Sequence, residues 1–150
     1  MAGIIRLAAF VVTVSALVFG ATQTPADLKA RADSAEGGNA VKPCLEYAHV
    51  QLEAANTLFN NGDADQGQAD IREVVEYARK GADAATASGK HLKDTEIKVR
   101  KLADRMHDIG ETLAFEDRQP VRQAVDELQQ IRSKLLVRMW GPDAVPKGSS

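Results

Sequence analysis

The sequence predicts an all-helical protein, an up-down-up-down antiparallel four-helix bundle made of two helical hairpins over residues 43–141. Two observations lead to this fold class. Apolar residues recur at alternating steps of three and four positions in four long segments, and short runs of turn-forming residues separate those segments. This period is typical of amphipathic helices, whereas a half-buried strand would alternate at every second residue. With 150 residues and 5% aromatic content, the chain is expected to form one domain with an aliphatic core.

The N-terminal segment has the features of a secretory signal peptide. Arg6 precedes an almost entirely apolar run from Leu7 to Phe19, and the run ends in residues that a signal peptidase tolerates. We therefore expect residues 1–20 to be a signal peptide cleaved after Gly20, and the mature protein to be exported, to the periplasm or the extracellular space. The run is shorter than the roughly 20 residues of a spanning helix, so no stable membrane insertion is expected after cleavage. Retention as an anchor is the alternative.

Two further regions are expected to lie outside the bundle. Residues 21–42 form a spacer, in which Pro25 can open a short helix that runs to about Ala35, since proline suits the first helical turn. Residues 142–150 contain two prolines, glycine and serine and predict a flexible tail. The four long helices are expected between these two regions.

Each of the four segments carries one apolar stripe. The stripes are Leu45, Ala48, Leu52, Ala55 and Phe59; then Gly67, Ile71, Val74, Ala78, Gly81 and Ala85; then Leu92, Thr95, Val99, Leu102, Met106, Ile109 and Leu113; and finally Val121, Val125, Leu128, Ile131, Leu135 and Met139. Small residues gather in the second stripe and large ones in the fourth. Because small and large side chains interdigitate across a helix interface, we expect these two helices to face each other.

The segments are separated by residues that favour helix ends. Asp63 or Asp65 is expected to cap the second helix after a turn at Gly62, and Gly89 is expected to end that helix. Asp117 is expected to cap the fourth helix, and Gly141 with the following proline to end it. The intervening loops are short, which forces neighbouring helices to run antiparallel.

Residues 48–75 resemble a single tetratricopeptide hairpin. The positions that carry the resemblance are Ala54, Ala55, Leu58, Phe59, Gly62, Asp63, Gly67, Ile71, Val74 and Val75. Hairpins of that family stack into grooves that bind peptides, so the resemblance implies an antiparallel helix pair and an interaction function. No second copy follows at the family spacing of about 34 residues, so a stacked array is not expected.

The layout of the bundle is also similar to that of small exported metal-binding proteins, which consist of two helical hairpins with Gly-x-x-Asp-like turns. The run Gly62-Asp63-Ala64-Asp65 fits such a turn. Members of that group bind metal through many histidines, whereas this chain has three. The resemblance implies the bundle architecture, and a metal- or small-cofactor-binding periplasmic bundle is therefore the alternative function.

Two local patterns place a carboxylate and a histidine on one helical face, Glu46-x-x-His49 and Asp104-x-x-His107. Di-metal helical bundles use paired patterns of this kind when the side chains point inward. Here the apolar stripes leave His49 at the margin of its helix, and Asp104 and His107 on the flank of theirs. We therefore expect salt bridges on the helix flanks and predict no metal site.

A haem held between methionine and histidine is a second cofactor hypothesis. The available ligands are Met106, Met139, His49 and His107, and the chain has no Cys-x-x-Cys-His motif. Methionine commonly fills gaps in a helical core. We therefore expect both methionines to be packing residues and predict no cofactor.

Basic residues share a broad face of the third segment: Lys90, Lys93, Lys98, Lys101 and Arg105. Such a face can meet phosphate or lipid head groups. Asp94 and Asp104 lie on the same face, however, so we interpret it as a solvated surface of mixed charge. The formal net charge of −2 does not favour nucleic acid, and no nucleic-acid partner is expected.

Cys44 is the only cysteine, so an exported chain of this sequence can form no internal disulfide. We interpret Cys44 as a small buried packing residue near a helix start. The alternative is an intermolecular disulfide or a reactive thiol. The stability of the fold is expected to come from packing alone.

The residues predict no enzyme, because the chain offers no Ser/His/Asp arrangement, no glycine-rich phosphate loop and no inward pair of carboxylates. We therefore expect an exported, non-enzymatic interaction or structural module with a protein partner. The candidate contact patch is Trp140 with Leu136 and Met139 at the end of the last helix, because exposed apolar clusters often bind partners.

Overall fold

The computed structural model describes residues 23–144, and all regular structure in that range is helical. This confirms the predicted all-helical class, but there are five α-helices where the sequence predicted four. They are α1 (Pro25–Ser34), α2 (Val41–Asn60), α3 (Ala64–Ser88), α4 (Leu92–Thr112) and α5 (Phe115–Trp140), with short 3-10 helices η1 (Gly37–Ala40) and η2 (Pro142–Ala144). The predicted signal peptide, residues 1–20, lies outside the described residues, as do residues 145–150 of the predicted tail.

α1 is the additional helix, and its sequence explains both its start and its attachment. Thr24 and Asp27 form a capping box, in which each side chain accepts a hydrogen bond from the backbone N–H of the other. Pro25 occupies the first turn. Leu28 and Ala32 lie one turn apart, and both are buried in the core. α1 confirms the short helix expected within the spacer, and its buried pair shows that this helix packs on the bundle rather than lying outside it.

α2 and α3 form the most extensive helix pair, and two glycines of α3 face α2 at close range. A Cβ atom at Gly67 would lie 2.9 Å from Phe59 Cε1, and one at Gly81 would lie 3.2 Å from Leu45 Cγ. Neither position accepts a side chain unless its neighbour moves. The expectation that the small residues of this helix face the fourth predicted helix is therefore wrong for both glycines, which serve the approach of α2.

The residues expected to cap or end the helices do so, except at the start of α5. Asp63 caps α3 by accepting a hydrogen bond from the backbone N–H of Gln66 at 3.3 Å. Gly89 and Gly141 end α3 and α5 with positive φ, which glycine adopts without steric cost. Asp117 is not the cap of the last helix, because α5 begins before it and includes it in the first turn. A carboxylate is favourable there through its interaction with the helix dipole.

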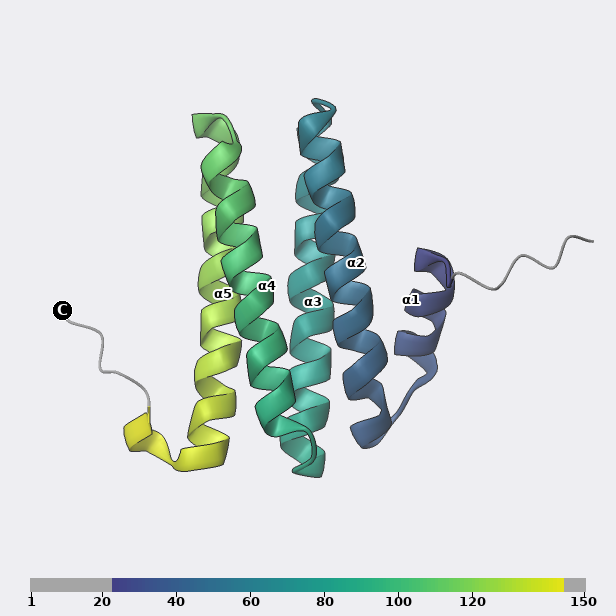
Figure 1. Cartoon of the computed structure of the whole chain (residues 1–150), viewed down its shortest axis with the longest axis vertical. Coiled ribbons are helices and arrows are strands. Elements are labelled where there is room, and N and C mark those ends of the chain that lie inside the picture. Colours follow the sequence, from purple (N-terminus) through teal and green to yellow (C-terminus); the bar gives the residue numbers. More distant parts are fainter. Residues whose placement is uncertain (1–22, 145–150) are drawn as a thin grey trace, which may run out of the picture.

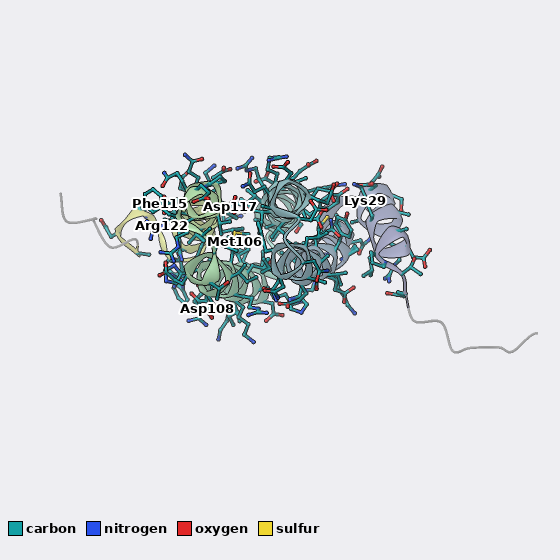
Figure 2. The ribbon with its side chains drawn as sticks, turned by 90° about the horizontal axis from the view of Figure 1, so that it is seen from above. Lys29, Met106, Asp108, Phe115, Asp117 and Arg122 are labelled. Carbon is teal, nitrogen blue, oxygen red and sulfur yellow. The ribbon has the colours of Figure 1, made fainter. Side chains whose placement is uncertain are left out.

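Figure 1 shows how the helices are arranged. α2 and α3 form one antiparallel hairpin and α4 and α5 another, while α1 lies beside α2 on the side away from α5. α2 packs next to α4, and α3 packs next to α5. Seen end-on in Figure 2, Met106 lies among the long helices, where it is fully buried together with Leu52 and Leu128. No described helix combines the length and hydropathy needed to cross a membrane.

Candidate functional site

A groove lies between α2 and α4, two helices that begin at the same end of the molecule (Figure 1). These helices pack together less extensively than either hairpin pair, and the groove between them has a volume of about 500 Å³. Its lining residues are Leu45, Glu46, His49 and Glu53 of α2 and Lys98, Lys101, Leu102 and Arg105 of α4. Buried Leu45 and Leu102 give it an apolar floor, and charged side chains form both walls.

One ion pair crosses this groove. The guanidinium of Arg105 donates from Nε and Nη2 to the two carboxylate oxygens of Glu53, both at 2.9 Å. These hydrogen bonds lower the pKa of Glu53, although burial acts in the opposite direction. Lys98 and Lys101, by contrast, have no carboxylate within ion-pair distance in the part of the chain that the structure describes. The α4 wall therefore keeps two uncompensated positive charges.

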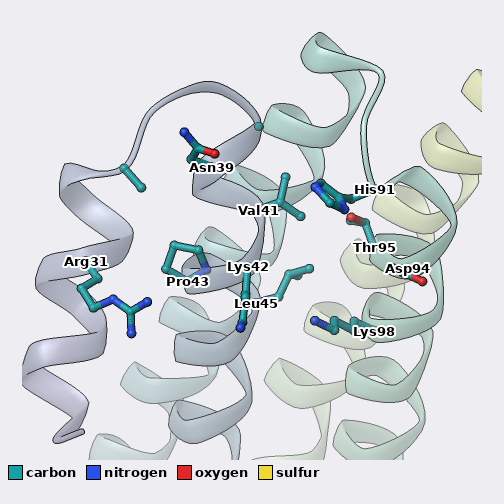
Figure 3. Close-up of a pocket in the computed structure, with 12 residues that line it drawn as sticks. Arg31, Asn39, Val41, Lys42, Pro43, Leu45, His91, Asp94, Thr95 and Lys98 are labelled. Carbon is teal, nitrogen blue, oxygen red and sulfur yellow. The ribbon is translucent and has the colours of Figure 1, made fainter.

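A second hollow, of about 480 Å³, continues the groove toward the start of both helices (Figure 3). Leu45 and Lys98 line both hollows, so the two adjoin, and together they are here termed the α2/α4 groove. Its end at the helix starts is termed the head pocket. The residues that line the head pocket include Arg31 of α1, Val41, Lys42 and Pro43 of α2, and His91, Asp94 and Thr95 at the start of α4.

The head pocket contains an unpaired buried hydroxyl group. Thr95 is 0% exposed, and its Oγ1 has no hydrogen-bond partner among the described residues. Figure 3 shows this oxygen on the side of α4 that faces the pocket. Ala40 and His91 precede α2 and α4, and neither side chain caps the helix that follows. Donor groups without side-chain acceptors therefore gather at this end of the groove, an arrangement that favours an oxyanion.

The two carboxylate–histidine patterns do not meet. Glu46 and His49 line the α2/α4 groove, whereas Asp104 and His107 are exposed on α4. Within residues 23–144, no group of three or more His, Cys, Asp or Glu side chains is placed to hold a metal ion. Glu46 instead pairs with Lys42 at 3.7 Å, one turn earlier on the same helix. This is a flank salt bridge of the kind that the sequence predicts.

The candidate sulfur ligands occupy different environments. Met106 is fully buried, whereas Met139 is half-buried near the end of α5. Cys44 is fully buried, and its Sγ lies 3.8 Å from the carbonyl oxygen of Ala32 in α1. Burial raises the pKa of the Cys44 thiol. A buried, protonated thiol is a poor nucleophile, in agreement with the interpretation of Cys44 as a packing residue.

The predicted contact patch lies on the last turns of α5. Trp140 is 72% exposed and Val137 is 39% exposed, while Leu136 and Met139 are half-buried. Residues three and four positions apart share a helical face, so Leu136, Val137 and Trp140 form one apolar surface, here termed the α5 apolar face. Val137 was not part of the predicted patch. In the sequence, only its position three residues before Trp140 indicates that Val137 belongs to this face.

A polar network that the sequence did not reveal joins α1 to the α2–α3 hairpin. Glu73 accepts hydrogen bonds from Lys29 Nζ at 2.7 Å and from the hydroxyl of Tyr47. The hydroxyl of Tyr77 donates to Asp33 at 2.6 Å. The two tyrosine rings meet edge-on, with centroids 4.5 Å apart, and Lys29 lies over both rings. These contacts fix α1 beside the hairpin.

The pKa shifts of this network agree with a structural role. Burial raises the pKa of Glu73, but the hydrogen bonds from Lys29 and Tyr47 outweigh it, and the pKa lies below its ordinary value. Burial, together with hydrogen bonding to the carboxylates, raises the pKa of Tyr47 and of Tyr77. These shifts keep the carboxylate ionised and both phenols protonated near neutral pH. The network therefore holds α1 rather than offering a reactive group.

Comparison of the chain with protein-family models, with curated proteins and with solved structures found no match in any of the three. The two resemblances in the sequence therefore rest on the residues quoted for them. The function must be inferred from the two surfaces that the geometry singles out, the α5 apolar face and the α2/α4 groove.

Proposed function

We propose that this protein is an exported, non-enzymatic interaction module that binds a partner protein through the α5 apolar face. Its scaffold is an up-down-up-down bundle of α2 to α5, to which α1 is added as a fifth helix. The observation that carries the proposal is the exposure of Trp140, at 72%, beside Val137 and Leu136 on one helical face. Clustered exposed apolar side chains mark interaction surfaces, and tryptophan is strongly enriched among the residues that dominate binding energy.

The charges beside the α5 apolar face indicate the kind of partner. Lys134 and Arg138 are both exposed and lie one turn apart in the same stretch of α5 as Val137 and Trp140. A complementary surface would offer an apolar pocket for the indole ring, bordered by carboxylates. Such a rim guides association and orientation, while burial of the indole supplies most of the affinity.

The export part of the proposal rests on the sequence from Arg6 to Gly20. A cleaved signal peptide would leave Ala21 as the first residue of the mature protein. N-terminal sequencing of the protein isolated from the exported fraction of its own cells tests this directly. A start at Ala21 would support export with cleavage, and an N-terminus that retains Arg6 would contradict it.

The partner is identified and measured in two steps. A photo-crosslinking residue in place of Val137 captures the bound protein in the cell, and titration of the purified partner then gives a Kd. We expect Trp140→Ala to weaken this Kd about thirtyfold, which corresponds to about 2 kcal/mol, the usual threshold for a dominant interface residue.

Phe115→Ala is the matched control. Phe115 is also an exposed aromatic residue of α5, at 86%, but it lies at the opposite end of the helix. We expect its replacement to leave the Kd unchanged, and equal effects of the two variants would contradict the proposal. Trp140 is the only tryptophan, so its emission offers an independent check. A blue-shifted maximum in dilute monomeric protein would show that the indole is already covered and would remove the surface.

A further inference from the structure

We propose that the α2/α4 groove binds an aliphatic carboxylate of the fatty-acid class, with the carboxylate in the head pocket and the chain along the apolar floor. This site is separate from the α5 apolar face and does not depend on the function proposed for that face. The inference rests on an unpaired buried hydroxyl, on cations from three helices that line the pocket, on two helix starts and on the shape of the groove.

The hydroxyl of Thr95 is the most specific of these features. It is completely buried, it has no hydrogen-bond partner among the described residues, and Figure 3 shows it on the pocket side of α4. A buried polar group without a partner is costly, so native structures seldom contain one without a reason. Because this oxygen has less than 1 Å² of accessible surface, an oxyanion in the head pocket would accept its hydrogen bond once the lining side chains move apart.

Cations from three different helices surround the same pocket. Arg31 approaches from α1, Lys42 from α2 and Lys98 from α4 (Figure 3). Asp94 is the only carboxylate among the lining residues. Lys42 has a distant intrahelical partner, at 3.7 Å, whereas Arg31 and Lys98 have no ion-pair partner within residues 23–144. The pocket therefore carries an excess of positive charge that one anionic group would offset.

The starts of α2 and α4 add to this positive potential. Both helices begin beside the head pocket, and neither has a side-chain cap. The N-terminal end of each helix dipole favours a negative charge. His91 at the start of α4 has a φ of 60°, the only positive value at a non-glycine residue in the described chain. Strain of this kind clusters at binding sites, where the surrounding structure maintains it.

The remainder of the groove suits an aliphatic chain. Its floor consists of Leu45 and Leu102, and the methylene groups of Lys98 and Lys101 extend the apolar lining. The two hollows measure about 480 and 500 Å³, within the range of small-molecule sites. Glu53 on the α2 wall is neutralised by its two hydrogen bonds to Arg105. That carboxylate therefore repels a bound anion little.

The two ends of the groove together select the ligand class. Inorganic phosphate would use the head pocket but leave the apolar floor uncovered. A neutral lipid would cover the floor but leave the cations and the Thr95 hydroxyl without an acceptor. Only a molecule with both an anionic head and an apolar chain satisfies both ends.

Three probes separate these possibilities by calorimetric titration of the purified protein: decanoate, its neutral analogue decanamide, and inorganic phosphate. We expect decanoate to bind at least about tenfold more tightly than either of the others, because it alone combines charge-assisted hydrogen bonds with burial of the chain. Equal binding of decanamide, equal binding of phosphate, or no detectable heat with decanoate would each overturn the proposal.

Variants then locate the site. Thr95→Val keeps the shape of the side chain but removes the hydroxyl, and Lys98→Met keeps the stem but removes the charge. Each is expected to weaken decanoate binding about tenfold or more. Lys93→Met is the matched control, because Lys93 is an exposed lysine of the same helix that does not line the groove. Circular dichroism confirms that each variant is folded, and loss of binding in the control alone, or in none of the three, would overturn the assignment.

Discussion

α2 has two neighbours among the long helices, and it meets them in opposite ways. Toward α3 the contact is close, because side chains of α2 pack against Gly67 and Gly81, where a Cβ atom would lie 2.9 Å from Phe59 Cε1 and 3.2 Å from Leu45 Cγ. Toward α4 the contact is less extensive, and two adjoining hollows lie beside it along Leu45, Lys98 and Arg105. α2 thus has a packed seam on the side of α3 and, on the side of α4, a hollow whose α4 wall carries the unpaired cations.

This difference separates stability from binding at the two interfaces of α2. Close-packed aliphatic side chains contribute most of the free energy of folding, because their removal leaves a cavity that the structure fills only partly. Exposed lysines at the margin of a groove contribute little, so their positions are free to serve a ligand. The comparison therefore predicts that substitutions on the two sides of α2 differ strongly in their effect on stability.

The largest effect is expected for Leu52→Ala. Leu52 is fully buried on α2, and truncation of such a leucine lowers the free energy of unfolding by about 3 kcal/mol through lost burial and the cavity left behind. Lys101→Met in the groove is the counterpart and is expected to change stability by no more than about 0.5 kcal/mol. Urea unfolding followed by circular dichroism measures both. Comparable losses in the two variants would show that the groove wall contributes as much to stability as the buried stripe of α2.

The second effect tests how tightly the seam is packed. Gly81→Leu introduces a side chain where even a Cβ atom would lie 3.2 Å from Leu45 Cγ and 3.3 Å from Cys44 Cβ. We expect a loss of about 2 kcal/mol, because overpacking forces the neighbours out of their preferred rotamers. Asp83→Leu introduces the same side chain at an exposed position of α3 and serves as the control. If both variants unfold at the same urea concentration, the seam is looser than the structure indicates.

The sequence predicted the helices and their ends well, but it did not predict which helices face each other. The stripe from Leu45 to Phe59 is visible because helical period alone defines it, and Gly89 and Gly141 end helices by a local preference. The partner of each helix is not a local property. The glycines of α3 could therefore be recognised as a close-approach surface, but not as one directed at α2.

The groove was harder to predict for the same reason. Lys98, Lys101 and Arg105 share a helical face in the sequence, but only the separation of α2 and α4 makes that face the wall of a hollow. Thr95 stands within an apolar stripe, where a hydroxyl must either find a partner or remain unpaired. That position and the basic face were the signals available in the sequence, but the basic face was interpreted as a solvated surface. α1 was underestimated because Leu28 and Ala32 form only a single buried pair.

α1 provides a third kind of contact, which depends on pH. The pKa of Glu73 is lower in the folded protein than its usual value of 4.5. The ionised network therefore stabilises the fold fully above that usual value, and the stabilisation is lost as the pH falls through the folded pKa. Glu73→Gln is expected to cost about 1 kcal/mol at neutral pH, and the difference from the wild type should shrink under acidic conditions.

Glu76→Gln is the control for this pH dependence, because Glu76 is an exposed residue of the same helix. We expect its unfolding curve to follow the wild type across the whole pH range. Thermal unfolding between neutral and acidic pH gives the comparison. A difference between Glu73→Gln and the wild type that persists unchanged at low pH would show that packing, rather than charge, holds α1.

The last expected effect is similar in size to that of Glu73→Gln but has the opposite sign. Thr95→Val removes a buried hydroxyl that has no partner, and in the ligand-free protein it is expected to raise the free energy of unfolding by about 1 kcal/mol. Thr57→Val on α2 is the control, because the Thr57 hydroxyl is exposed and donates to the carbonyl oxygen of Glu53 at 3.1 Å. A higher free energy of unfolding for Thr95→Val alone would show that threonine at this position destabilises the ligand-free protein. This is expected of a residue that serves binding rather than packing. A loss would show that the hydroxyl already has a partner in solution and would remove the strongest argument for the head pocket.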